Sequence, residues 1–175
     1  MSLPSHLETQ FAALWRDHRG IFHKIARGFT PSPADEADLV QAMLVQLWRS
    51  LGSFGGECKA STWVYRVCLN TALSWKRDEG RRLKRLPIEE ADDSLTCPRP
   101  DPQQTRERGE RLEALYAAIR DLVPAERSLM LLFLDGLSYR EIGDVAGMTE
   151  NHVGVALNRV RKKLTESLKE VRDEA

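Results

Sequence analysis

Apolar residues return every three or four positions along most of this chain, which is the spacing of one face of an α-helix. Before residue 87 the pattern predicts three helices, over about 7–25, 34–51 and 61–75. A Thr-Pro-Ser-Pro stretch at 30–33 and a glycine-containing stretch at 52–56 interrupt it. After residue 105 the same spacing predicts four more helices, which begin near residues 106, 124, 138 and 149.

The segment between these two groups of helices has a different composition. Its prolines stand among acidic and small polar residues: Pro87, Pro98, Pro100 and Pro102. Such a sequence cannot bury much apolar surface, so residues 87–105 are predicted to form a flexible, acidic and proline-rich linker. The predicted fold class is therefore all-α, with two small helical domains over 1–86 and 106–175.

The stretch 135–164 carries the strongest local pattern. Ser138 and Glu141 have the spacing of a capping box, which predicts the start of a short helix. Gly147 can adopt positive φ in the following turn, and Thr149 can cap the next helix. Apolar residues then recur at helical spacing: Val153, Leu157, Val160, Leu164, Leu168 and Val171. This order predicts a helix-turn-helix, with an ordinary helical hairpin and a solvated basic end as the alternative.

Charge is balanced overall but unevenly distributed. Lysine and arginine total 26, as do aspartate and glutamate, so composition alone does not indicate nucleic acid. Two basic clusters flank an acidic stretch: Lys76, Arg77, Arg81, Arg82, Lys84 and Arg85 before it, and Arg159, Arg161, Lys162 and Lys163 after it. Two such clusters are typical of two phosphate-facing surfaces, although solvated helix faces have the same pattern.

The three cysteines, Cys58, Cys68 and Cys97, have no Cys-x-x-Cys spacing, which favours reduced thiols in a cytoplasmic protein. The histidines are too scattered to suggest a metal site, and no phosphate loop or nucleophile–base pair is present in the sequence. No apolar run approaches membrane-spanning length. We therefore expect a cytoplasmic protein that is not an enzyme, needs no metal or cofactor and does not insert into a membrane.

Three segments of the second half resemble region four of bacterial sigma factors. Residues 136–143 read Gly-Leu-Ser-Tyr-Arg-Glu-Ile-Gly and resemble its GLSYxEIA signature. Residues 122–127 are similar to its LPxxxR lead-in. The TVxSRLxRARxxL frame of that region is matched by Val153, Leu157, Arg159, Arg161 and Leu164.

The first half resembles region two of the same proteins. Residues 38–41, with Leu47 and Trp48, are similar to its DLVQ-to-LW stretch, and residues 62–67, with Asn70, resemble its WLYRIARN segment. Two unrelated motif sets in the right order, with only a linker between them, resemble the sigma-70 family. The short length is similar to that of its extracytoplasmic-function group.

The resemblance implies a sigma factor that binds core RNA polymerase and directs promoter-specific transcription initiation. It implies polymerase contacts through Asp38, Leu39, Gln41 and Trp48. It implies capture of the melted −10 element by Phe54, Lys59, Trp63, Arg66, Asn70, Lys76, Arg77, Arg81 and Arg82. It implies −35 element binding by Thr149, Asn151, His152, Asn158, Arg159, Arg161 and Lys162. The implied partners are core RNA polymerase, promoter DNA and an anti-sigma factor.

Simpler interpretations of some of these residues stay open. Leu39, Trp48 and Trp63 could instead be core side chains, because helix faces of this composition are commonly buried, and for Trp48 the core is the favoured interpretation. The alternative function is a helix-turn-helix transcriptional regulator that is not a polymerase subunit. The stretch 38–70 favours the sigma factor, since a simple regulator has no use for a polymerase-docking and strand-capture unit.

The chain also departs from the family pattern. Leu69 stands where an arginine is common, and Ser74 where an aspartate is common. Gly154, Val155 and Ala156 stand where Lys, Ser and Arg are typical. We expect Ala156 to face outward and to make no base contact, so the −35 element should tolerate base substitution and most selectivity should lie in the −10 element.

Overall fold

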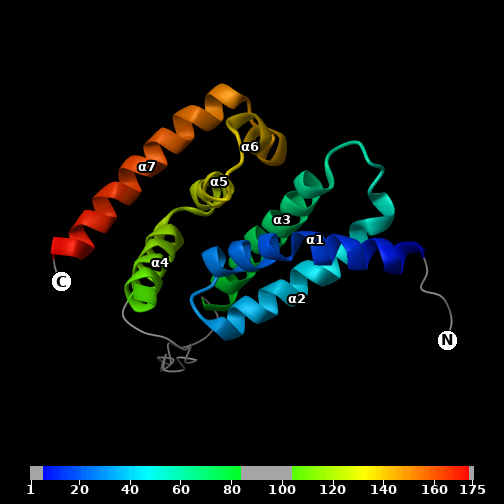
Figure 1. Ribbon diagram of the computed structural model, residues 1–175, viewed down its shortest axis with the longest axis horizontal. Coiled ribbons are helices and arrows are strands. Elements are labelled where there is room, and N and C mark those ends of the chain that lie inside the picture. Colours follow the sequence, from blue (N-terminus) through cyan, green and yellow to red (C-terminus); the bar gives the residue numbers. More distant parts are fainter. Residues whose placement is uncertain (1–5, 84–103, 174–175) are drawn as a thin grey trace.

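The computed structural model describes residues 6–83 and 104–173, and the side chains of residues 6–79 and 109–169. Every regular element in these ranges is helical, which confirms the predicted all-α class (Figure 1). The elements are α1 (His6–Phe29), α2 (Pro33–Ser50), the 3₁₀ turn η1 (Leu51–Ser53), α3 (Ala60–Leu83), α4 (Gln104–Asp121), α5 (Pro124–Leu134), α6 (Tyr139–Ala146) and α7 (Glu150–Asp173). None of these helices is both long and apolar enough to cross a bilayer.

The first three helices pack on one another and form an N-terminal unit. Ser32 caps α2 by accepting a hydrogen bond from the backbone N–H of Asp35, and Pro33 supplies the fixed φ that suits a first helical turn. The apolar stripes of the three helices meet in a core whose largest side chains are fully buried: Phe22, Ile25, Leu39, Met43, Leu47 and Val64. Each such side chain contributes about 1.5–3 kcal/mol on burial.

The last four helices form a C-terminal unit with the predicted helix-turn-helix. The capping box at the start of α6 is complete, because Ser138 accepts from the N–H of Glu141 and Glu141 accepts from the N–H of Ser138. Gly147 ends α6 in the left-handed region at φ 69°, a conformation that glycine adopts without steric cost. The hydroxyl of Thr149 then caps α7 by accepting from the N–H of His152 at 3.3 Å.

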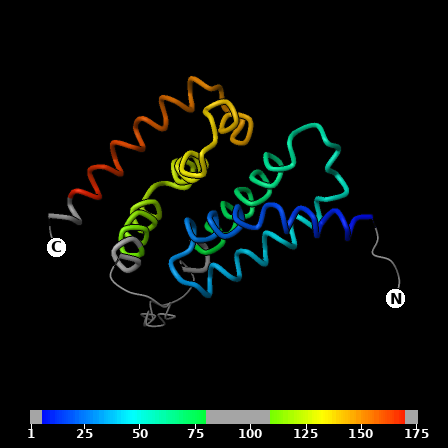
Figure 2. Tube along the Cα trace, in the orientation of Figure 1, coloured from blue at the N-terminus to red at the C-terminus, as the bar shows by residue number. Residues whose placement is uncertain are grey.

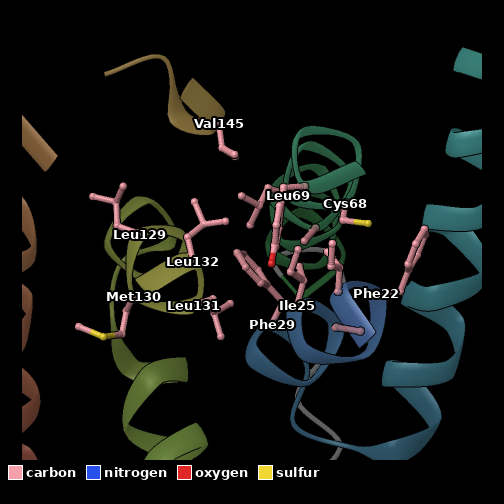
Figure 3. Packing of buried hydrophobic residues seen from close by; sticks show 14 of the residues in the cluster. Phe22, Ile25, Phe29, Cys68, Leu69, Leu129, Met130, Leu131, Leu132 and Val145 are labelled. Carbon is pink, nitrogen blue, oxygen red and sulfur yellow. The ribbon is translucent and has the colours of Figure 1, made fainter. Parts of the chain in front are cut away.

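The two units pack against each other, which the sequence did not predict (Figure 2). Helices α1 and α3 contact α4, α5 and α6, and the buried apolar residues of both units form one continuous cluster. Figure 3 shows Leu131 and Leu132 pointing from α5 toward α1 and α3, whereas Leu129 and Met130 point into the C-terminal unit. A helix as short and apolar as α5 has two faces to bury, and its own unit covers only one of them.

Most of the predicted linker, residues 87–105, lies outside the described residues, and so does the predicted domain boundary at residues 86–87. Its last two positions belong to α4, which begins at Gln104 and not at 106. The third helix begins at Ala60, one residue before its predicted start at residue 61.

Candidate nucleic-acid interface

One face of α2 is exposed along its length and includes two apolar side chains. Asp38, Gln41, Val45 and Trp48 follow one another at helical spacing, and all four are exposed. Val45 is 49% exposed and Trp48 45%, values that are high for large apolar residues in a packed helix. The ring of Phe11 from α1 meets Trp48 edge-on, with the centroids 5.4 Å apart.

On this face of α2 the structure corrects one expected polymerase contact, Leu39, and adds another candidate, Val45. Leu39 is completely buried against α1 and α3, so its side chain has no surface to offer a partner and is a core residue. Trp48 is exposed, which corrects the expectation that it is a core residue, and its role as a contact stays a prediction. Val45 was missed, although its spacing between Gln41 and Trp48 in an otherwise polar row is the signal that identifies it.

A second candidate surface is built around two stacked rings. Phe54, just after η1, stacks on Trp63 in the first turn of α3, with centroids 4.7 Å apart and planes inclined by 29°. Both rings are half-buried, so Trp63 is neither a core residue nor fully free. They border a cavity of about 470 Å³ whose lining also includes Gly55, Cys58, Lys59, Thr62 and Arg66. The predicted strand-capture residues Phe54, Lys59, Trp63 and Arg66 are therefore brought together.

The other side of this cavity belongs to the C-terminal unit. Lys59 Nζ lies 3.2 Å from a carboxylate oxygen of Glu141 in α6. Arg66 donates through Nε, at 3.2 Å, and through Nη2 to the backbone carbonyl of Asp144. The same two cations that the sequence assigns to DNA are thus engaged by α6.

The remaining residues of the predicted −10 surface continue along α3. Asn70, Lys76 and Arg77 border a separate cavity of about 560 Å³. Lys76 pairs with Glu79 at 2.7 Å, and Arg77 donates to the hydroxyl of Ser74 at 2.9 Å. The side chains of Arg81 and Arg82 lie outside the described residues.

The third candidate surface is a groove along α7. Its volume is about 810 Å³, and its lining is Tyr139, Glu150, Asn151, Gly154, Val155, Asn158, Arg159 and Lys162. Four of the predicted −35 residues, Asn151, Asn158, Arg159 and Lys162, therefore share one face. Arg161 instead lies over the ring of Phe133 on α5, 5.5 Å from its centroid. Thr149 caps the helix, and His152 is exposed beside the groove without lining it.

The unusual residues of α7 have separate structural explanations. A Cβ on Gly154 would lie 3.4 Å from the ring of Tyr139, so the ring packs on the helix where a longer side chain is typical. Val155 is 47% exposed and points into the groove. Ala156 is half-buried against the core, which corrects the expectation that it faces outward.

Two ionisable groups have clear structural roles. Hydrogen bonds from Ser138, aided by Lys59, lower the pKa of Glu141 from 4.5 to about 2. Arg127 is buried, and burial lowers its pKa. It donates to the carbonyls of Arg120 and Leu122 at the end of α4 and lies over the ring of Phe29, 4.9 Å from its centroid.

The low pKa of Glu141 makes a pH-dependent contribution to stability. A carboxyl group with a lowered folded-state pKa stabilises the fold above its ordinary value of 4.5, and that contribution is lost as pH falls toward about 2. Glu141→Gln can keep the capping geometry but cannot titrate. We expect the melting temperatures of the two proteins to converge as pH falls through this window. Melting curves that stay parallel would contradict the assignment.

The described residues contain no group of His, Cys, Asp and Glu side chains able to hold a metal ion. Cys58 is half-buried beside the stacked rings, and Cys68 is fully buried in the N-terminal core, where burial raises the pKa of its thiol.

Comparisons with known proteins match both units. Residues 14–82 match the family Sigma-70 region 2, and residues 112–164 match the family Sigma-70, region 4. The chain is 30% identical to the ECF RNA polymerase sigma-E factor of Salmonella typhimurium, over 79% of its own length and 75% of that protein. It is also 30% identical to the ECF RNA polymerase sigma factor SigE of Mycolicibacterium smegmatis, over 89% of its own length but only 60% of that protein.

A solved structure has the same fold. The sigma factor RpoE, crystallised with the anti-sigma factor NepR from Bartonella quintana, superposes with a TM-score of 0.70 and 20% identity. The match covers 91% of this chain and 97% of that one. At 20% identity this likeness shows the fold alone, in which both units are bundles of helices.

Proposed function

The chain belongs to the sigma-70 family, within its extracytoplasmic-function group, and from this premise we propose that it binds core RNA polymerase and directs promoter-specific transcription initiation. The observation that supports the proposal is the presence, in one chain, of a stacked aromatic pair flanked by cations near α3 and of a groove along α7 bordered by Arg159 and Lys162. We propose that this function is one of binding and not of covalent chemistry.

The exposed face of α2 is the proposed docking site for the polymerase. A specific protein interface combines apolar anchors with a polar rim, and this face has Val45 and Trp48 beside Asp38 and Gln41. Tryptophan is enriched among residues that dominate binding energy, because it buries a large area with few rotatable bonds. Trp48 is therefore the proposed anchor.

The Phe54–Trp63 pair and its flanking cations are the proposed site for the melted −10 element. Unpaired bases expose flat faces that stack on aromatic rings, at about 1–3 kcal/mol per base. Lys59 and Arg66 lie beside the rings, and Asn70, Lys76 and Arg77 continue the surface along α3 toward Arg81 and Arg82. A single strand lying along α3 would stack its bases on the two rings near the start of the helix and place its phosphates on the cations further along it.

Helix α7 is the proposed reader of the −35 element. An α-helix fits the major groove of B-DNA, and Asn151, Asn158, Arg159 and Lys162 face the same way along α7. Asparagine pairs with adenine and arginine with guanine, so Asn158 and Arg159 are the proposed base contacts. Because Gly154 and Val155 lack donors, tolerance of base changes in this element remains our prediction.

A helix-turn-helix regulator outside the polymerase is the weaker alternative. Such a protein would use α7 alone and would leave the docking face of α2 and the ring pair of α3 without a role. The relative solved with an anti-sigma factor supports a further proposal, that an anti-sigma factor also controls this chain. We place this activity in the cytoplasm, where core polymerase and promoter DNA are found.

Run-off transcription with purified core polymerase tests the proposed function. The chain is added to core enzyme with fragments of genomic DNA. Transcripts with defined 5′ ends are expected only when the chain and the core enzyme are both present. Trp48→Asp should abolish start-site selection by weakening core binding, while helicity stays unchanged. The absence of any defined start on every fragment would overturn the proposal.

A gain of DNA affinity is expected from Val155→Arg. The new side chain would extend into the groove of α7 from an exposed position, where it can neutralise a phosphate. The affinity for duplex promoter DNA should rise, and the slope of log K against log salt should steepen by about one unit. Fluorescence anisotropy across a salt series measures both.

Ala156→Arg is the matched control. This variant adds the same charge one residue further along the helix. Ala156 is half-buried against the core, so the larger arginine side chain would disturb the packing there, and the main effect should be on stability. An unchanged salt slope in Val155→Arg would mean that the groove does not face DNA.

A further inference from the structure

The groove along α7 has an apolar residue at the centre of a polar stripe. Asn151 lies one turn of the helix before Val155. Asn158 and Arg159 lie one turn after it, so these four side chains follow one another on one face of α7. The three polar residues are exposed, and Val155 is itself 47% exposed. Packing within the described residues therefore does not explain why an apolar side chain stands at the centre of this stripe.

A row of ring contacts fixes the wall of the groove beside Val155. Arg161 of α7 lies over the ring of Phe133, 5.5 Å from its centroid, and that ring lies 6.3 Å from the ring of Tyr139 on α6. Tyr139 in turn packs on α7, because a Cβ on Gly154 would lie 3.4 Å from its ring. The row runs from α7 through α5 and α6 and back to α7, where α6 lies beside the start of that helix (Figure 1). It therefore holds α7 in the rotation that turns Val155 outward.

The major groove of duplex DNA offers one apolar group to such a residue. Each base pair presents hydrogen-bond donors and acceptors there, and only thymine adds a methyl group. Val155 is the sixth residue of α7, and the N-terminal part of a recognition helix is the part that contacts base edges. Arg159 and Lys162 border the same groove and supply the positive charge that duplex DNA attracts. A valine in this place has nothing to offer a donor or an acceptor, but it can contact a methyl group.

We propose that Val155 is a specificity-determining residue that reads the 5-methyl group of one thymine in the −35 element, with Tyr139 and Gly154 lining the groove beside it. The inference rests on the proposed function and deepens it, because it names a group that the groove recognises. Val155 and Asn158 are three residues apart, about 4.5 Å along the helix axis, and one base-pair step is about 3.4 Å. The thymine therefore lies in the base pair next to the one that Asn158 contacts.

A methyl contact discriminates weakly, which agrees with the tolerance expected of this element. Burial of one methyl-sized group is worth about a factor of four in affinity, whereas a bidentate hydrogen-bond pair is worth about 5- to 150-fold. One mild preference for thymine thus stands in an element that otherwise tolerates base changes. The same contact accepts 5-methylcytosine, because its methyl group occupies the same place in the major groove.

Removal of the thymine methyl group tests the proposal. Duplexes enriched from a random-sequence pool by the full chain on core polymerase supply the probes, and deoxyuridine replaces each thymine of the −35 element in turn. One replacement should lower the affinity about fourfold in a fluorescence anisotropy titration at fixed salt, and the others should leave it unchanged. Uracil keeps every hydrogen-bonding group of thymine, so the methyl group alone accounts for the difference.

Substitution of Val155 identifies the side chain that makes the contact. Val155→Ala shortens an exposed side chain, so helicity should not change, and the variant should bind the thymine and uracil duplexes with equal affinity. Val123→Ala is the matched control, because Val123 is 57% exposed but lies outside the groove of α7. It should keep the wild-type preference for thymine.

A gained methyl group gives an independent measurement. Cytosine is placed at the thymine position, and the duplexes with and without a 5-methyl group on that cytosine are compared. The methyl group should raise the affinity of the wild-type chain about fourfold and leave that of Val155→Ala unchanged.

The possible outcomes separate this proposal from the proposed function. Equal affinity for thymine and uracil at every position would overturn the recognition of a methyl group, while the enrichment of a promoter sequence would still support the proposed function. A preference for thymine that survives Val155→Ala would overturn the assignment to Val155. A pool from which no sequence is enriched would refute the proposed function, and the methyl contact with it.

Discussion

Trp63→Ala is expected to lower open-complex formation by about 5- to 150-fold. The variant removes one ring of the stacked pair, and stacking of an unpaired base on an aromatic ring contributes about 1–3 kcal/mol, where 1.4 kcal/mol corresponds to a factor of ten. Phe54 would also lose the partner that holds its ring 4.7 Å away. Permanganate reactivity of promoter thymines in the presence of core polymerase measures the opened fraction.

Trp63→Phe is the informative control, because it keeps an aromatic face and should retain most of the activity. Trp75→Ala removes a half-buried tryptophan from the same helix but outside the cavity lining, and should affect stability more than opening. Wild-type opening by Trp63→Ala would show that the ring is structural and that the capture site lies elsewhere on α3.

Arg127→Ala is expected to lower the free energy of unfolding by about 2–4 kcal/mol, which is large for one substitution. The guanidinium caps α4 through the carbonyls of Arg120 and Leu122, and a hydrogen bond to a charged group contributes about 1.5–3 kcal/mol net to stability. Alanine would also leave a cavity beside the ring of Phe29. Urea unfolding followed by circular dichroism measures the loss.

Arg127→Met separates the two contributions. Methionine keeps the packing of the stem and introduces no charge, so it should lie between wild type and alanine, since replacing a buried charge by an apolar side chain is often tolerated. Arg140→Ala, at an exposed position of α6, should change stability by less than about 0.5 kcal/mol. A similarly small effect of Arg127→Ala would mean that water replaces the guanidinium at little cost.

These two residues show how far a motif can be interpreted from sequence. Arg127 belongs to the lead-in that resembles region four, yet its side chain faces inward and closes the end of α4. Trp63 belongs to the segment that resembles region two, and its ring borders a cavity beside Arg66. A motif identifies a position that the fold uses, but only the surroundings of the side chain distinguish a structural use from a binding one.

The packing of the two units on each other also explains Leu69, which no local sequence pattern does. From the sequence it is a departure from an expected arginine. In the structure it is buried opposite Leu132 and Val145, which lie far from it along the chain (Figure 3). The pairing of this leucine with α5 and α6 is therefore a property of the two units together.

The sequence by itself determined the helices, their order and the helix-turn-helix. These features depend on interactions within one or two turns of chain: apolar spacing, the Ser138–Glu141 capping box, the proline at the start of α5 and the glycine at the end of α6. Such contacts are encoded by neighbouring residues, so they can be predicted without knowledge of the rest of the fold.

Only the tertiary structure decided which residues at the edges of each apolar stripe are buried, and which neighbouring helices bury them. Leu39 proved to be core while Trp48 and Val45 are exposed, and Ala156 turned inward while Val155 faces the groove. A stripe on a helix marks a face about a hundred degrees wide, so residues at its edges are assigned only when neighbouring helices are in place. The packing of α5 on Gly28 likewise needs two segments far apart in the chain, and no local pattern specifies that contact.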